Sequence, residues 1–237
     1  MDLNSRIEDA AKSFWATRAR QSSKQKSSGV SDAGSRSAVT GGKQLEAFEM
    51  LTIDIALRSG IEEKAIYQAT SLELPGYYRP TKKWDLLIID EGILVAAIEY
   101  KSQVGPSFGN NFNNRLEEAV GTATDLWTAY REGAFADSPK PWLGYFFVLE
   151  DCEKSRIPVK VSEPHFNVFP EFKNASYSER YLLLQQKLIR ERLYDASSLI
   201  LTQKEPFTVT ASKKEISAKR FFSQFQGHLK AYLNEKN

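Results

Sequence analysis

The sequence contains few of the residues that several functional classes need. Among its 237 residues there are one cysteine, Cys152, and two histidines. A single cysteine excludes a disulfide within the chain and is typical of a reducing compartment. Two histidines and one cysteine are also too few for a four-ligand metal cage built from these residue types. The chain therefore has neither the composition of a small disulfide-bonded secreted protein nor that of a zinc-cage protein.

Long apolar runs and a strong net charge are also missing. The apolar stretch LGYFFVL at 143–149 is too short to span a bilayer. The N-terminal segment MDLNSRIEDAAKS is charged throughout, so we expect no signal peptide and a cytoplasmic location. The net charge is only +2, so any site for nucleic acid must come from local clustering of basic residues.

What is present predicts a globular core preceded by a helix and a linker. Residues 1–20 carry a helical stripe of apolar side chains at Leu3, Ile7, Ala10, Phe14 and Trp15. Residues 21–42 are rich in Ser and Gly, basic and without periodicity, which is typical of a flexible linker or of a loop that orders on binding. We therefore expect an N-terminal helix over 1–20, a flexible basic linker over 21–42 and one domain over 43–237.

The pattern within 43–237 predicts an α/β fold with a mixed central β-sheet flanked by helices. The expected elements, in order, are a helix over 43–59, a hairpin within 82–102, a polar loop over 104–114, a helix from an Asn114/Glu117 capping box to Gly133, a buried strand over 142–151, a loop over 152–175, a helix from a Ser176/Glu179 capping box to about Ala196, a strand over 198–202 and a last helix around 221–229.

Charged residues interrupt the hairpin at both of its ends. Glu99 and Lys101 are two residues apart, so on a strand they face the same side, and Tyr100 faces the other. If a three-residue loop over 91–93 closes the hairpin, Asp85 falls directly across from Glu99. A two-residue turn would instead put these two acids on opposite faces of the sheet.

Two opposed carboxylates at the end of a core strand favour a divalent cation. The carboxylates repel each other, and burial increases the cost, whereas Mg²⁺ with its preference for oxygen ligands removes that cost. Lys101 would then stand beside the metal, where an ammonium stabilises developing negative charge or assists a water. The alternative is that Glu99 and Lys101 form a solvated strand end and that Asp85 caps a turn.

Basic, aromatic and amide side chains flank the hairpin and are candidates for DNA contact. Arginine and lysine beside aromatic residues suit phosphates and sugars, and asparagine suits the edges of adenine. The asparagines can also be read as helix-cap and turn residues. The candidates are Tyr77, Tyr78, Arg79, Lys82 and Lys83 before the hairpin, and Asn110, Asn111, Asn113, Asn114 and Arg115 after it.

Four blocks of sequence resemble the XhoI family of type II restriction endonucleases over roughly residues 41–202. The blocks are LPGYYRPTKKWDLL, VAAIEYKSQVGPSFGNNFNNRLEEAVGTATDLW, LEDCEKS and PHFNVFPEFKNASY. The resemblance implies a restriction-endonuclease-like core with a PD-(D/E)xK site. It also implies a homodimer that uses Mg²⁺ to cut both strands of double-stranded DNA at the palindrome CTCGAG, leaving 5′ overhangs, and a cognate DNA methyltransferase in the host.

The resemblance also implies roles for individual residues. Asp85 and Glu99 would be the two acids, Lys101 the lysine, and the Tyr100 carbonyl a further metal ligand. Glu46, on the preceding helix together with Glu49, matches the place of an additional acid. Trp84 stands before Asp85 where the family pattern usually has proline.

Two other functions remain open on the sequence. A nuclease with the same core can serve DNA repair or cut particular DNA structures, and a protein with a degenerate site can bind DNA without cutting it. His165 is open as well, either as a general base or as a structural histidine among aromatic residues, and Cys152 is expected to be packed.

Overall fold

The structure, a computed structural model, describes residues 2–27 and 43–236. The main elements follow in the order α1 (Leu3–Ser27), α3 (Glu46–Arg58), β1 (Ile66–Tyr67), β2 (Glu73–Pro75), β3 (Thr81–Lys83), β4 (Leu86–Asp90), β5 (Ile93–Gln103), α4 (Phe108–Arg131), β6 (Trp142–Glu150), α5 (Glu153–Arg156), α6 (Tyr177–Arg190), β7 (Ala196–Gln203), β8 (Thr208–Ala211) and α7 (Ala218–Lys236). Short 3₁₀ turns lie at Glu63–Ala65, Pro170–Phe172 and Lys214–Ile216. Within the described residues, no helix is both apolar and long enough to cross a membrane.

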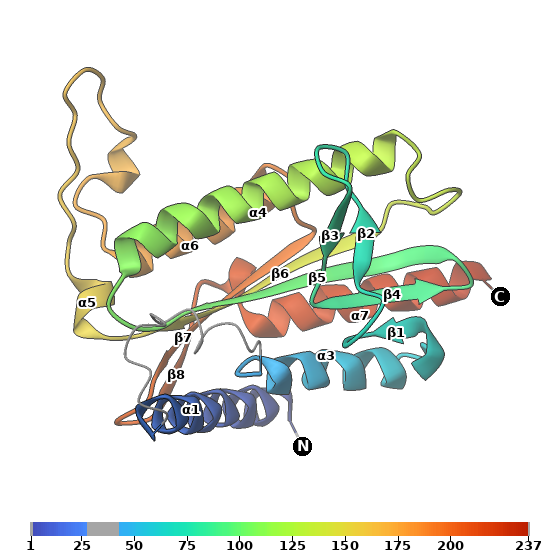
Figure 1. Cartoon of the computed structure of the whole chain (residues 1–237), viewed down its shortest axis with the longest axis horizontal. Coiled ribbons are helices and arrows are strands. Elements are labelled where there is room, and N and C mark those ends of the chain that lie inside the picture. The colour runs from blue at the N-terminus through green and yellow to red at the C-terminus, as the bar shows by residue number, and fades with distance from the viewer. Residues whose placement is uncertain (1, 28–42, 237) are drawn as a thin grey trace.

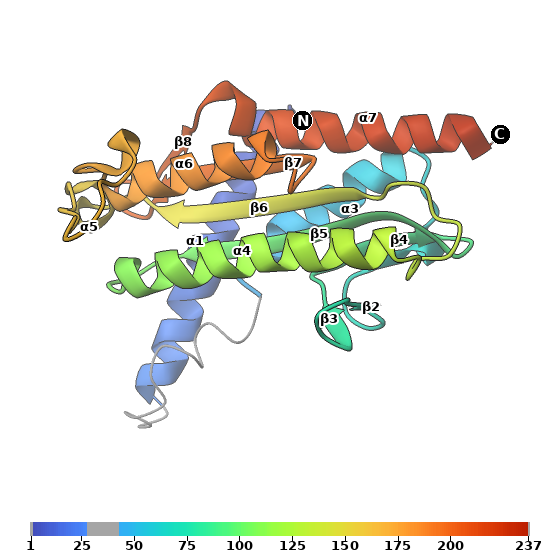
Figure 2. The same ribbon diagram turned by 90° about the horizontal axis from the view of Figure 1, so that it is seen from above.

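Six strands form the central sheet in the order β1-β4-β5-β6-β7-β8. The central strands β5, β6 and β7 are parallel, and the outer pairs are antiparallel, so the sheet is mixed. Helices α4 and α6 cover one face, and α1, α3 and α7 lie on the other (Figures 1 and 2). The predicted fold class is therefore confirmed.

Each face of the sheet carries its own hydrophobic core, which explains why β6 is apolar throughout. Phe146 and Val148 pack with α1, α3 and α7 on one side. Tyr145 and Phe147 pack with α4 and α6 on the other. A strand buried on both faces has no solvent side and so loses the alternation of polar and apolar residues.

The N-terminal helix is part of this core and is longer than predicted. Phe14 is fully buried, and the indole N–H of Trp15 donates a 3.0 Å hydrogen bond to the Thr202 hydroxyl. The helix continues to Ser27, so residues 21–27, predicted as linker, are helical. The rest of the predicted linker, 28–42, lies outside the described residues.

The start of α4 corrects a second boundary. The segment 104–114 was expected to be a loop ended by an Asn114 cap, but the helix already begins at Phe108, and Asn114 lies inside it. Phe108 and Phe112 are one turn apart, both buried, and pack on Tyr177 and Tyr181 of α6. This burial outweighs the low helix propensity of the asparagines between them. The predicted capping box that opens α6, by contrast, is confirmed.

Boundaries near the C-terminus differ by a few residues. Helix α6 ends at Arg190 rather than near Ala196, and the strand predicted over 198–202 extends over Ala196–Gln203. The region 152–175, expected to be a loop, contains the short helix α5 and a 3₁₀ turn.

The β4–β5 hairpin closes differently from the prediction. Asp90 pairs with Ile93 across a two-residue turn, Glu91-Gly92, and not across a three-residue loop. Both turn residues have positive φ, +50° and +85°, as a type I′ turn requires. With an uninterrupted ladder, this turn would place Asp85 and Glu99 on opposite faces.

A β-bulge corrects the register. Between the pairs Ile89↔Leu94 and Ile88↔Ala96, β5 contains one extra residue, Val95. Val95 and Ala96 are consecutive in sequence, yet both pack into the same core. The Val95 carbonyl accepts a 3.0 Å hydrogen bond from His228 Nε2 on α7. Because bulges leave a backbone group outside the ladder, this contact satisfies an otherwise costly carbonyl.

Beyond the bulge the strands return to the expected pairing. Leu86 pairs with Ile98, so the next position outward sets Asp85 opposite Glu99. The predicted juxtaposition is present, and the bulge, which the sequence did not reveal, creates it.

Candidate active site

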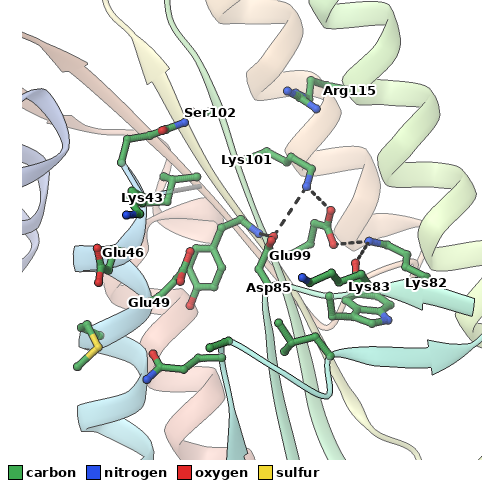
Figure 3. Close-up of a pocket in the computed structure, with 18 residues that line it drawn as sticks. Lys43, Glu46, Glu49, Lys82, Lys83, Asp85, Glu99, Lys101, Ser102 and Arg115 are labelled. Atoms are coloured by element: carbon green, nitrogen blue, oxygen red, sulfur yellow. Dashed lines mark hydrogen bonds and ion pairs between the residues drawn. The ribbon is translucent and has the colours of Figure 1, made fainter. Parts of the chain in front are cut away.

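A cleft opens beyond the first residue of β4, where β5 continues without a pairing partner on that side. Strand β4 begins at Leu86, whereas β5 extends to Gln103, so the edge of β5 beyond Ile98 has no β4 residue paired with it. A cavity of about 770 Å³ lies at this edge, between α3, β3 and α4 (Figure 3). Its charged lining residues are Lys43, Glu46, Glu49, Lys82, Lys83, Asp85, Glu99, Lys101 and Arg115.

Strand alternation sorts the residues of β5 as predicted. Tyr100 is 3% exposed and points into the core, where its hydroxyl lies 2.6 Å from that of Thr52 on α3. Glu99 and Lys101 share the opposite side and form an ion pair with each other. Anchoring Tyr100 in the core therefore fixes the direction in which the two charged neighbours project.

Lys101 links the two acids. Its ammonium contacts Glu99 Oε1 and lies 3.8 Å from Asp85 Oδ2. The second Glu99 oxygen accepts a 2.7 Å hydrogen bond from Lys82 on β3. Glu99 is only 6% exposed, and a buried carboxylate is costly unless it is paired in this way. A single cation is thus already within reach of both carboxylates.

Asp85 takes the place of a missing ladder partner. Its Oδ2 accepts a 2.7 Å hydrogen bond from the backbone N–H of Tyr100. In a strand, the N–H and C=O of one residue point to the same edge. The Tyr100 carbonyl therefore faces the edge at which Asp85 stands.

Burial and neighbouring charges shift the pKa values in opposite directions. Burial, followed by the charge of Glu99, raises the pKa of Asp85. Burial would also raise the pKa of Glu99, but Lys101 and Lys82 outweigh it, so that pKa is lowered. Burial acts to lower the pKa of Lys101, and the two acids outweigh it and raise that pKa. The lysines therefore compensate Glu99 more fully than Asp85.

Of the two acids in the first turn of α3, Glu49 is the one coupled to the cluster. Burial, then Asp85, then Glu46 raise the pKa of Glu49 to about 7. Both acids line the cleft, but Glu46 is exposed and Glu49 is half-buried (Figure 3). The prediction chose Glu46, whereas the structure favours Glu49, one turn of helix further along.

The donor set suits a hard cation. Among the described residues, no group of three or more His, Cys, Asp or Glu side chains forms a preassembled metal cage. Two carboxylates and a backbone carbonyl remain, an all-oxygen set that leaves room for water and phosphate oxygens, as Mg²⁺ sites usually do. The residues present therefore fit the metal that the sequence predicts.

Comparison with known proteins gives the family. The family described as "Restriction endonuclease XhoI" matches residues 24–213. The chain belongs to the XhoI restriction endonuclease family. This match is wider than the resemblance seen in the sequence over 41–202, and it confirms the restriction-endonuclease class that the blocks indicated.

Three curated relatives support this assignment. The chain is 52% identical over 179 residues to the type II restriction enzyme BstVI of Geobacillus stearothermophilus, covering 73% of this chain and 80% of that protein. It is 51% identical over 178 residues to the type II restriction enzyme XhoI of Xanthomonas vasicola, covering 74% and 71%. It is 49% identical over 166 residues to the type II restriction enzyme AbrI of Azospirillum brasilense, covering 70% and 74%. No solved structure matches the chain significantly.

The predicted DNA-contact residues of this XhoI-family chain fall into three places. Lys83 and Arg115 line the cleft, and so does Lys82, which is 13% exposed, pairs with Glu99 and lies 4.8 Å from the Trp84 ring centre. Tyr77, Tyr78 and Arg79 stand at the tip of the β2–β3 ribbon. The four asparagines lie on the first turns of α4, and none of them is among the residues that line the cleft.

His165 and Cys152 lie away from the cleft. His165 is exposed on the segment between α5 and α6 and does not line the cleft. Cys152 is half-buried and packs at the edge of the α4–α6 core, as expected. The structure thus places His165 away from the acids of the cleft, beside which a general base would have to lie.

Sequence reasoning missed one buried carboxylate entirely. Asp125 of α4 is 3% exposed and bonds to the loop that carries Tyr77 and Tyr78. A charged residue within the apolar sequence ATDLW could have drawn attention to it, but nothing local identified its partner 48 residues away.

Proposed function

We propose that the chain is a Mg²⁺-dependent homodimeric endonuclease that cuts both strands of double-stranded DNA at CTCGAG and leaves 5′ overhangs. Membership of the XhoI family and three relatives named as type II restriction enzymes support site-specific cleavage. The recognition sequence and the overhang come from the sequence resemblance. A host methyltransferase that protects the same site, and a cytoplasmic location beside the host DNA, belong to this proposal.

One observation carries the catalytic part of the proposal. The Lys101 ammonium contacts Glu99 and lies 3.8 Å from Asp85, at the edge of an open cleft. Buried charges of opposite sign are found together mostly where they are paired for stability or used in chemistry. Here the network lines a cavity large enough for a phosphodiester, which favours chemistry.

Each residue then has a defined role. Asp85, Glu99 and the Tyr100 carbonyl would hold the metal, and Glu49 would extend the acidic side of the cleft. Bound Mg²⁺ supplies charge neutralisation of the phosphate and a lowered pKa for a water. Lys101, as an ammonium beside the acids, stabilises the negative charge that develops on the phosphate and orients the attacking water.

The cleft also has a group suited to the phosphate backbone. Arg115 projects from α4 toward Lys101 (Figure 3). Its side chain is 19% exposed and pairs with Glu118 on the same helix. A guanidinium has several N–H donors and suits phosphate oxygens.

A digest tests the proposal directly. The chain is incubated with a sequenced plasmid in Mg²⁺, alongside a Glu99→Ala variant, and the fragment ends are sequenced. We expect discrete fragments that end at CTCGAG with 5′ overhangs, and no cutting by the variant. Smeared or structure-dependent cutting would instead support a repair-type nuclease. Binding in Ca²⁺ without any cutting in Mg²⁺ would support a DNA-binding protein without activity.

A further inference from the structure

The β2–β3 ribbon presents two tyrosines to solvent. It is a separate two-stranded sheet that projects away from the central one (Figures 1 and 2). Its tip is the segment 76–80. Tyr77 and Tyr78 within it are 53% and 70% exposed, with ring centres 5.0 Å apart in an edge-to-face arrangement. Neighbouring exposed aromatic rings are typical of a surface that binds a partner.

A buried carboxylate on another element holds this tip. The side chain of Asp125, in the C-terminal half of α4, is 4% exposed. One of its oxygens accepts hydrogen bonds from the backbone N–H groups of both Tyr77 and Tyr78, each at 2.8 Å. The other accepts the Nε–H of Arg79 at 2.6 Å. Hydrogen bonds to an ionised acceptor are stronger than neutral ones, so this anchor is strong.

The tip is tightly packed around this anchor. A Cβ added at Gly76 would lie 2.7 Å from Asp125 Oδ2 and 2.7 Å from the Arg79 carbonyl oxygen. The Gly76 N–H also bonds across the turn to the Pro80 carbonyl at 3.3 Å. A loop closed this tightly is already ordered by folding. Binding a ligand therefore costs it little further conformational entropy.

The tip is close to the cleft along the chain. Strand β3 leads from it directly to Lys82, Lys83 and then Asp85. Tyr78 and Asp85 are seven residues apart, so at about 3.3 Å per residue they are separated by at most about 23 Å, or about seven base-pair steps. A duplex with its scissile phosphate in the cleft can therefore contact the tip within less than one helical turn.

We propose that Asp125 is a positioning residue that holds Tyr77, Tyr78 and Arg79 in a preformed arrangement for contact with duplex DNA beside the scissile phosphate. The inference rests on the proposed function. The tyrosine rings would pack against sugars or base edges in a groove. The two terminal nitrogens of Arg79 make no hydrogen bond to the described residues, and its side chain is 42% exposed, so they can meet a phosphate.

The experiment separates positioning from stability. The dissociation constant of a duplex containing CTCGAG is measured in Ca²⁺, and kcat, KM and Tm in Mg²⁺, for wild type, Asp125→Asn and Asp125→Ala. Asp195→Asn is the matched control, because the Asp195 carboxylate also anchors the backbone of another element, accepting a 2.9 Å hydrogen bond from the Leu143 N–H, and Asp195 does not line the cleft. We expect both Asp125 variants to raise Kd and KM by about 10- to 100-fold, with kcat at saturating DNA within about 3-fold of wild type. The control should lower Tm and leave Kd unchanged.

A double-mutant cycle tests whether Asp125 acts through the tip. In a Tyr77→Ala/Tyr78→Ala background, Asp125→Ala should raise Kd by less than about 3-fold, because groups that act as one unit are not additive. Additive losses, or an unchanged Kd for Asp125→Ala beside an actively cutting wild type, would overturn this inference alone. A wild-type protein that neither binds nor cuts any duplex would overturn the proposed function as well.

Discussion

At the scale of single residues, the site depends on two lysines that share one acid. Glu99 is buried, and its carboxylate pairs with the ammonium groups of both Lys82 and Lys101. Only Lys101 also approaches Asp85. Both ammonium groups therefore compensate the charge of Glu99. Only the ammonium of Lys101 is placed to act at both carboxylates.

Replacing these lysines one at a time gives the first prediction. Lys101→Met should lower the single-turnover cleavage rate by about 10²–10³-fold or more, because it removes a charge placed for the transition state. Lys82→Met should lower it less, since Lys101 still links Glu99 to Asp85. Binding of a specific duplex in Ca²⁺ should survive both changes. Equal rates for the two variants would contradict the special role of Lys101.

The acids of α3 give the second prediction. Glu49 is half-buried and coupled to Asp85, whereas Glu46 is exposed on the same helix. Glu49→Gln should lower kcat by about 10- to 100-fold, as loss of a group that supports metal ligands usually does. Glu46→Gln serves as the matched control and should cost much less. A larger loss for Glu46→Gln would restore the residue chosen from the sequence.

At the scale of elements, α7 holds the hairpin that carries the site. Its His228 bonds to the bulge at Val95, and its Tyr232 and Lys236 bond to Asp90 beside the turn. The C-terminal helix thus fixes the strand pair at two points. A bulge sets the register of the strands beyond it, so a second element that holds the bulge secures the pairing on which Asp85 and Glu99 depend.

The Asp90 contact gives a pH-dependent prediction. The Lys236 hydrogen bond, followed by that of Tyr232, lowers the pKa of Asp90 below its ordinary value of 3.8, with Lys64 acting in the same direction despite partial opposition from burial. A lowered folded-state pKa stabilises the protein above the ordinary value, and this stabilisation is lost as pH falls through the folded pKa. The urea-unfolding free energy of Asp90→Asn should therefore be below wild type at pH 6, and the gap should narrow below roughly pH 4.

Two comparisons make this measurement specific. Asp137→Asn, at an exposed position, is the control for removing one carboxylate without removing these contacts. A gap between wild type and Asp90→Asn that stays constant from pH 6 to pH 3 would show that the contribution of Asp90 does not depend on its charge.

At the scale of the whole molecule, one chain offers one cleft of this kind among its described residues. A palindromic site has two identical halves related by a twofold axis, and each half contains one scissile phosphate. A protein that cuts both strands in one encounter therefore needs two such clefts, related by the same axis.

Sedimentation gives the last prediction. In Ca²⁺, the complex with a duplex bearing CTCGAG should contain two chains per duplex, and a scrambled duplex of equal length should bind more weakly. Sedimentation velocity with both duplexes, at matched salt concentration, measures stoichiometry and preference together, since affinity for DNA depends strongly on salt. One chain per duplex would contradict the dimer, and equal affinity for the scrambled duplex would contradict sequence recognition.

The sequence by itself determined what depends on local pattern. The alternation of Glu99, Tyr100 and Lys101 placed the two charges on one face, and the Ser176 cap opened α6 where expected. The uninterrupted apolar run of β6 indicated a strand buried on both faces. These features follow from periodicity and from short-range hydrogen bonds, which involve residues close together in the chain.

Only the tertiary structure decided what depends on distant partners. The two-residue turn alone would have separated Asp85 from Glu99, and the bulge at Val95, held by His228 from 133 residues away, brought them together. The approach of Glu49 to Asp85 and the anchor from Asp125 to the tyrosine tip arise in the same way. Each requires the packing of one element against another, and no local sequence pattern records which distant residue completes a buried hydrogen bond.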